Sequence, residues 1–257
     1  MQAVPLPQAF LCAPIAHRAL HDRSKGRIEN SLSAVRAAVA AGYGIEMDIQ
    51  LSADGVAMVF HDDTLDRVAV ATGPLAARTA AELGNIRLKD STDTIPTFAE
   101  VLKLVVGRVP LLVELKDQTH LKAETDGKLE RAVAVDLADY QGPVALMSYN
   151  PYSVFWLKSL CPGLPRGITT SSYGPDDAKG LSEHRAADLR NIPDYARTDS
   201  SFISHEATDL GRARVAELKA QGASVLCWTI RSPEAEAAAR RVAQNVTFEG
   251  YLAAFPA

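Results

Sequence analysis

The chain has 257 residues, a formal net charge of −4 and a pI near 5.9, and 47% of its residues are hydrophobic. This acidic balance excludes the basic surface typical of nucleic-acid-binding domains, and no apolar run approaches the ~18 residues of a membrane span. The sequence starts without a charged and apolar leader and its three cysteines are scattered, so we expect a cytoplasmic protein.

Short apolar runs alternate along the chain with segments of helical periodicity. Ser31 and Thr97 are expected as helix N-caps and Gly42 as a C-cap, while Cys12 and Cys227 lie in apolar runs and are expected in the core. The apolar runs predict strands over residues 10–17, 44–50, 56–61, 110–116, 144–149, 166–170, 201–204, 224–230 and 246–248. The periodic segments predict helices over residues 31–41, 76–83, 97–105, 127–138, 151–160, 210–221 and 233–241.

This alternation predicts an α/β fold with a parallel sheet and helical crossovers, and ~250 residues is the usual length of a TIM (β/α)8 barrel. A barrel has eight strand positions, so one of the predicted strands is extra. The link over residues 50–56 is too short for a helix and contains the turn sequence Asp54-Gly55, which predicts a hairpin there. We interpret residues 1–257 as a single domain with a small insertion at about residues 65–95.

Two acidic residues share one face of the strand over residues 44–50. Because side chains alternate along a strand, Glu46 and Asp48 face one way and the apolar residues beside them face the other. In a barrel such a face points into the interior, where two carboxylates repel each other unless a cation lies between them. Oxygen ligands favour Mg²⁺ or Ca²⁺, with Mn²⁺ as an alternative, over zinc. We therefore predict a single divalent cation at these two residues.

The strand over residues 110–116 repeats the pattern with Glu114 and Lys116. By themselves, these two residues are equally well explained as a buried ion pair. Beside Glu46 and Asp48, however, Glu114 supplies a third oxygen ligand, and Lys116 supplies a positive charge for an anion that the cation also holds.

Two histidines end strands, which is where a barrel carries its functional residues. His17 is followed by Arg18, and His61 by Asp62. A single histidine at a strand end is most often structural, but two of them beside a metal site suit acid–base cleavage of a phosphodiester. Arg18 fits bidentate binding of the phosphate. Three other histidines are expected in loops: His21, His120 and His184.

These residues stand in motifs that resemble the glycerophosphodiester phosphodiesterase family in order and spacing. The likeness is dense over about residues 13–116 and thinner to residue 250. The motifs are Ala16-His17-Arg18, Glu29-Asn30-Ser31, Ile45-Glu46-Met47-Asp48, His61-Asp62-Asp63-Thr64-Leu65-Asp66-Arg67, Ile95-Pro96-Thr97, Val113-Glu114-Leu115-Lys116 and Trp228-Thr229.

The resemblance implies a TIM barrel that uses a divalent cation to hydrolyse glycerophosphodiesters to glycerol 3-phosphate and an alcohol. It also implies that Glu29 and Asn30 shape the loop over the site. The implied roles are an acid–base pair of His17 and His61, phosphate binding by Arg18 and Lys116, a pocket wall at Trp228, and metal ligands Glu46, Asp48 and Glu114.

The chain departs from the family pattern at two positions, which concern substrate choice more than chemistry. Ala19 stands where the family usually has glycine, and Glu249 ends the last strand where an aspartate is expected. Two alternatives stay open: a phospholipase-like or sugar-phosphodiester phosphodiesterase with the same centre, and a catalytically silent barrel that binds phosphodiesters. The expected partner is a small-molecule substrate, and the sequence leaves open the leaving alcohol, the preferred metal and the oligomeric state.

Overall fold

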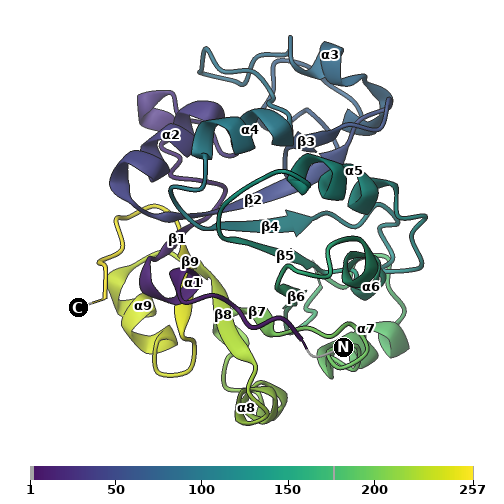
Figure 1. The fold of residues 1–257 in the computed structure, drawn as a ribbon, viewed down its shortest axis with the longest axis vertical. Helices are drawn as coiled ribbons and strands as arrows, with labels where there is room; N and C mark the ends of the chain where they lie inside the picture. The colour runs from purple at the N-terminus through teal and green to yellow at the C-terminus, as the bar shows by residue number, and fades with distance from the viewer. Residues whose placement is uncertain (1–2, 176, 257) are drawn as a thin grey trace.

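The computed structural model describes residues 3–175 and 177–256, and its eight barrel strands run parallel. They follow chain order around a closed ring, because the first strand pairs with both the second and the last. This ring with its surrounding helices confirms the predicted TIM barrel (Figure 1). Its strands are β1 (Ile15–Ala16), β2 (Gly44–Leu51), β4 (Leu111–Leu115), β5 (Val144–Ser148), β6 (Arg166–Thr170), β7 (Phe202–Glu206), β8 (Ser224–Ile230) and β9 (Asn245–Phe248).

The connecting helices lie outside the barrel (Figure 1). The Ser31 hydroxyl accepts a hydrogen bond from the Ala34 amide at the start of α2, and Gly42 ends that helix with φ 78°. Thr97 and Glu100 form a capping box at the start of α4. These caps confirm the predicted boundaries. The helices are α2 (Leu32–Ala41), α4 (Phe98–Val105), α5 (Lys128–Leu137), α6 (Pro151–Leu160), α7 (Glu183–Arg190), α8 (Ala213–Ala220) and α9 (Pro233–Ala239).

The extra strand is a hairpin partner and not a member of the ring. β3 (Ala57–Val59) runs antiparallel to β2, with Ile49 opposite Val59. The turn is closed by a hydrogen bond from the Gly55 amide to the Ser52 carbonyl, and Gly55 has φ 82°. The expected hairpin is therefore confirmed.

After this hairpin, a segment with η2 (Leu75–Ala77) and α3 (Ala80–Leu83) projects beyond α4 (Figure 1). The helix expected over residues 76–83 is broken, because Arg78 is extended and Thr79 begins α3 as a new N-cap. The segment packs on its own small core, away from the helices around the barrel. This core contains Ile28, Met58, Phe60, Leu65, Val68, Ala69, Leu75, Leu83, Leu88 and Ile95.

The first predicted strand is wrong over its first half. Residues Ala9–Cys12 form the short helix α1, and only Ile15–Ala16 belong to β1. Phe10 of α1 is fully buried in the N-terminal end of the barrel, so the apolar run reflects burial and not strand structure. Cys12, which was expected in the core, is exposed on this helix, whereas Cys227 is buried as expected.

The helix α7 was not among the predicted elements. Only Ala186 and Leu189 are buried along it, so it lacks the apolar stripe on which a helix prediction depends. His184 consequently lies on a helix, and its expected place in a loop is wrong. Among the described residues, no helix has the length and apolar character needed to cross a membrane.

The barrel interior changes from apolar to polar along its axis. At the N-terminal end of the strands, Phe10 packs with Leu112, Phe202 and Leu226. Gly167 makes room for this layer, because a Cβ atom there would lie 2.5 Å from the Phe202 ring. Towards the C-terminal ends of the strands, the inward side chains are carboxylates, hydroxyls and basic groups, and these build the site.

Candidate active site

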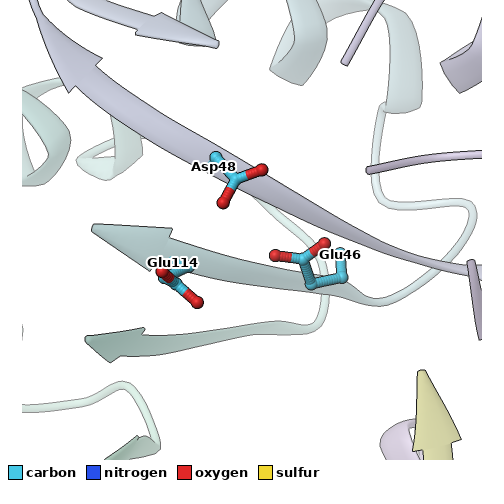
Figure 2. A group of neighbouring side chains, drawn as sticks. All are labelled: Glu46, Asp48 and Glu114. Atoms are coloured by element: carbon cyan, nitrogen blue, oxygen red, sulfur yellow. The ribbon is translucent and has the colours of Figure 1, made fainter. Parts of the chain in front are cut away.

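Three buried carboxylates meet inside the barrel. Glu46 and Asp48 extend inward from β2 and Glu114 from the neighbouring β4, and Figure 2 shows their carboxylates turned towards one shared space. One oxygen from each residue lies within 4.8 Å of the others. Their residues are 3%, 2% and 6% exposed, so water screens their mutual repulsion little.

Basic and amide groups surround this cluster. The Lys116 ammonium lies 2.9 Å from Glu114 Oε1 and 3.4 Å from Asp48 Oδ1. The Arg18 amide donates to Glu46 Oε2 at 2.9 Å, and Arg18 Nε lies 3.6 Å from Asp48 Oδ2. The Asn30 amide group donates to the same Asp48 oxygen at 2.9 Å. Lys116 stays charged, because its neighbouring carboxylates outweigh burial and raise its pKa.

The electrostatics of the cluster favour a bound cation. Burial raises the pKa of Glu46 well above its usual value, and the negative charges of Asp48 and Glu114 raise it further. Burial would also raise the pKa of Asp48, but the charges of His61 and Lys116 lower it below its usual range. The nearby positive charges thus lower the pKa of Asp48, whereas the pKa of Glu46 stays raised. A hard divalent cation among the three oxygens would add the positive charge that favours the ionised form of all three carboxylates. These residues therefore fit a divalent cation.

His17 follows β1 and is held by the carboxylate of Glu249, which directly follows the adjacent strand β9. Its Nδ1 lies 2.5 Å from Glu249 Oε2, and both side chains are less than a fifth exposed. The other Glu249 oxygen accepts a hydrogen bond from Arg231 Nε at 2.7 Å. Burial lowers the pKa of His17 below its usual value, against the hydrogen bond to Glu249, which raises it. The carboxylate thus holds the ring with Nδ1 turned away from the cavity.

His61 follows β3 and has a carboxylate partner of its own. Its Nδ1 lies 2.6 Å from Asp62 Oδ1, and Arg67 Nε donates to the other Asp62 oxygen at 2.6 Å. None of the described residues forms a hydrogen bond with Nε2 of either His17 or His61. Because each Nδ1–H donates a hydrogen bond to a carboxylate, Nε2 of the neutral ring is an acceptor available to a substrate.

A chain of ion pairs joins the two histidine loops. Glu29 accepts hydrogen bonds from Arg18 at 2.8 Å and from two Arg67 nitrogens at 2.7 Å. Arg67 in turn holds Asp62, the partner of His61. The backbone bends sharply beside these contacts, because Arg18 has φ 52° and Ala19 has φ 64°. The Ala19 methyl is buried and its amide donates to the Glu46 carbonyl, so this residue fixes the turn that presents Arg18.

All the site residues predicted from the sequence line a single cavity of about 370 Å³. One wall is aromatic: Trp228 meets Tyr149 edge to face, with ring centroids 5.8 Å apart, and its Nε1 donates to the Ser204 carbonyl at 3.0 Å. The predicted residues that the fold brings together here are His17, Arg18, Glu46, Asp48, His61, Glu114, Lys116 and Trp228.

Sequence reasoning missed two carboxylates of the site. Glu249 was noted only as a departure from a family pattern, although its position directly after the last strand was a signal. Asp62 stood inside a quoted motif without a role. Two other histidines lie near these strands. His21 lies in a loop as expected, and its Nε2 is 3.6 Å from a Glu249 oxygen. His205 is buried on β7.

Comparison with known proteins places this geometry in a family. The model of the glycerophosphoryl diester phosphodiesterase family matches residues 17–247. A glycerophosphodiester phosphodiesterase of Caldanaerobacter subterraneus is 32% identical over 162 residues, which span 60% of this chain and 65% of that relative, just under two thirds of its length. The YhdW protein of Bacillus subtilis is 26% identical over 233 residues, 87% of this chain and 88% of that protein.

A solved structure shows the same architecture. A phosphodiesterase of Oleispira antarctica, in complex with the product sn-glycerol-3-phosphate, superimposes with a TM-score of 0.74 over 94% of each chain. Its sequence identity to this chain is 24%, so this likeness bears on the fold alone.

Proposed function

Because the chain belongs to the glycerophosphoryl diester phosphodiesterase family, we propose that it hydrolyses glycerophosphodiesters to glycerol 3-phosphate and an alcohol. The observation that carries this proposal is the composition of the cavity. The three clustered carboxylates, the cationic side chains of Arg18 and Lys116, and two carboxylate-backed imidazoles line the same space. Cleavage of a phosphodiester needs each of these groups, namely charge stabilisation at phosphorus, a proton acceptor and a proton donor.

Glu46, Asp48 and Glu114 would hold one divalent cation, Mg²⁺ or Ca²⁺, with Mn²⁺ as an alternative. When bound, such an ion polarises a phosphoryl oxygen and stabilises charge that develops in the transition state. The three carboxylates outnumber the two cations, Arg18 and Lys116, that face them. A dication therefore leaves the centre with one surplus positive charge, which matches the single negative charge of a phosphodiester.

Arg18 and Lys116 would bind and orient the phosphate. The Lys116 ammonium already bridges two of the carboxylates, so an anion next to them also meets this charge. The Arg18 guanidinium is fixed by Glu29 from one side, which leaves its remaining donors for a phosphate oxygen.

His17 and His61 would move the protons. One imidazole takes a proton at Nε2 from the glycerol hydroxyl next to the esterified carbon as that oxygen attacks phosphorus, and the other donates a proton from Nε2 to the departing alcohol oxygen. Water then opens the resulting cyclic 1,2-phosphate with the two histidine roles reversed, which gives glycerol 3-phosphate. Glu249 and Asp62 hold the rings in the required tautomer and stabilise the imidazolium that forms. Each carboxylate accepts from Nδ1 throughout, so the proton that moves is always the one on Nε2.

The test is release of glycerol 3-phosphate from glycerophosphocholine, coupled to glycerol 3-phosphate dehydrogenase. We expect product release that stops with EDTA and returns with Mg²⁺, Ca²⁺ or Mn²⁺. Glu46→Gln should lower the rate at least about 100-fold, because it removes a charge from the cation site. The matched control is Glu130→Gln: Glu130 is equally buried, lies on α5 outside the cavity and has a pKa raised by burial, so its loss should leave turnover unchanged.

The outcomes of this assay separate the alternatives. Full activity after exhaustive chelation would contradict the role of the cation. Turnover of acylated or sugar phosphodiesters in place of glycerophosphocholine would favour the phospholipase-like or sugar-phosphodiester phosphodiesterase. Binding of glycerophosphocholine without any turnover would identify a silent barrel.

A further inference from the structure

A second cavity joins the central one at residues that would hold the phosphate. This outer cavity has a volume of about 530 Å³ and shares four lining residues with the central cavity, namely Glu114, Lys116, Tyr149 and Asp177. A phosphodiester carries two substituents on its phosphorus. A phosphate bound next to Glu114 and Lys116 therefore has one cavity for each substituent.

The outer cavity lies on the His61 side of the centre. Asp63, two residues after His61, lines it, and most of the remaining wall comes from the loop between β4 and α5 and from residues 177–180. The imidazole that protonates the departing alcohol must reach the ester oxygen. With His61 as that proton donor, the alcohol extends from His61 into the outer cavity, and the inference therefore rests on the proposed function.

The Lys122 ammonium is held where the two cavities meet. Its Nζ lies 5.8 Å from the centroid of the Tyr149 ring and donates to the Asp177 carbonyl at 3.3 Å. The backbone of this residue is fixed separately. The Lys122 amide donates to Asp117 Oδ2 at 2.7 Å, and Arg185 donates to the Lys122 carbonyl at 2.8 Å. Because these backbone contacts do not involve the ammonium, the side chain can be replaced while the loop is kept.

The surroundings of this ammonium favour an anion beside it. In residues 3–175 and 177–256, its contacts are an aromatic ring and a carbonyl, and no carboxylate forms an ion pair with it. Burial lowers the pKa of Lys122, against the charges of Asp117 and Asp177, which raise it. An anionic group next to the ammonium would offset the burial, because an opposite charge favours the charged form.

Two carboxylates of the outer cavity have partners of their own. Asp63 Oδ2 lies 3.3 Å from His120 Nδ1. Asp117 accepts four hydrogen bonds, from the Thr119 amide, the Thr119 hydroxyl, the Lys122 amide and the Asn150 side chain. The ammonium groups of Lys122 and Lys179 line the same space. The groups that remain to contact an alcohol here are therefore mainly cationic donors.

A cationic alcohol would compete with Lys122 for the same place. Quaternary ammonium groups bind over aromatic rings, and Tyr149 is the aromatic ring that both cavities share. Burial and the negative charge of Asp177 raise the pKa of this phenol, so a cation beside the ring is favoured. The Lys122 ammonium already supplies that cation, and a second one would meet a like charge.

We propose that the outer cavity binds the departing alcohol and that Lys122 makes the enzyme prefer alcohols that carry an anionic group. A carboxylate on the alcohol would lie next to the Lys122 ammonium, whereas the ammonium of an ethanolamine or choline group would be repelled by it. Lys122 is thus a specificity-determining residue for the leaving group, at the end of the substrate opposite to the glycerol.

The test uses glycerophosphoserine and glycerophosphoethanolamine, whose departing alcohols differ only by one carboxylate. The measured quantity is kcat/KM for release of glycerol 3-phosphate by the Mg²⁺- or Ca²⁺-loaded protein. The native protein should favour the serine ester about five- to tenfold, because a partly buried charge contact contributes more than an exposed one. Lys122→Gln should bring the ratio of the two values close to one, Lys122→Glu should invert it, and Lys122→Arg should keep most of the preference.

Lys158→Gln is the matched control. The Lys158 ammonium on α6 also lies over an aromatic ring, 5.9 Å from the Phe155 centroid, but it lines neither cavity. This variant should keep the native ratio. If it changes the ratio as Lys122→Gln does, the effect comes from the net charge of the protein and the inference is wrong.

Two further results would overturn the inference. One is a native protein that releases glycerol 3-phosphate from both esters with equal kcat/KM, in which case the proposed function stands without this specificity. The other is a native preference that survives both Lys122→Gln and Lys122→Glu. A native protein that releases glycerol 3-phosphate from neither ester nor from glycerophosphocholine contradicts the proposed function as well.

Discussion

Replacing Glu249 by glutamine tests whether the carboxylate behind His17 contributes to catalysis. The substitution keeps the size of the side chain and a hydrogen-bond acceptor but removes the negative charge 2.5 Å from Nδ1. It also releases Arg231, whose Nε now donates to Glu249 at 2.7 Å. Both changes disfavour the protonated imidazole, so the pKa of His17 should fall further below its usual value.

The size of the effect follows from the geometry. A hydrogen bond to a charged group contributes ~1.5–3 kcal/mol and a neutral one ~0.5–1.5 kcal/mol. The difference, about 1–1.5 kcal/mol, corresponds to about one pKa unit and to about tenfold in rate. Solvent reduces this value little, because the His17 and Glu249 side chains are only 14% and 19% exposed.

The assay is kcat/KM for glycerophosphocholine as a function of pH. The limb that belongs to His17 should move to lower pH by about one unit, whether this residue acts as base or acid. Glu249→Asp, which keeps the charge, should leave the limb near its native position and lower the rate through the shorter side chain. Unchanged limbs in Glu249→Gln would refute the reasoning, because the carboxylate would then be only a structural contact.

Two further substitutions test the second histidine and the barrel core. His61→Ala should lower turnover of glycerophosphocholine about 10²–10⁴-fold and cost far less with a nitrophenyl ester, whose leaving group needs little protonation; equal losses on both substrates would argue against a role as acid. Gly167→Ala should lower the free energy of unfolding by about 2–3 kcal/mol in a denaturant titration, because its Cβ would lie 2.5 Å from the Phe202 ring. The control is Gly163→Ala, which has no atom within 4 Å and should be near neutral, and equal effects at the two glycines would contradict the packing argument.

Much of the fold could be predicted because its signals are local. Strand alternation, the Ser31 and Thr97 caps and the Asp54-Gly55 turn each depend on residues close in the chain, and the structure agrees with all of them. The wrong secondary-structure predictions occur where the apolar pattern of the sequence reflects burial in the fold and not the local secondary structure. Phe10 is apolar because it closes the barrel from a helix, and α7 is polar because little of it is buried.

For the site, the sequence by itself determined which chemistry is present. Glu46 and Asp48 face the same way because side chains alternate along a strand, and this holds for Glu114 and Lys116 as well. The period of a strand is a local property, so the inward set of each strand was readable without the fold. The meeting of the Glu46 and Glu114 strands was also predicted, because both inward sets end in carboxylates.

Only the tertiary structure decided the partners. Glu249 lies 232 residues from His17 in the chain, yet the strands that they follow, β9 and β1, are neighbours because the barrel closes. Ser204 on β7 and Thr247 on β9 look like ordinary strand residues until closure of the ring leaves both buried against the cavity. Closure is a global event that pairs the two ends of the chain, and no local pattern encodes which side chains it brings into contact.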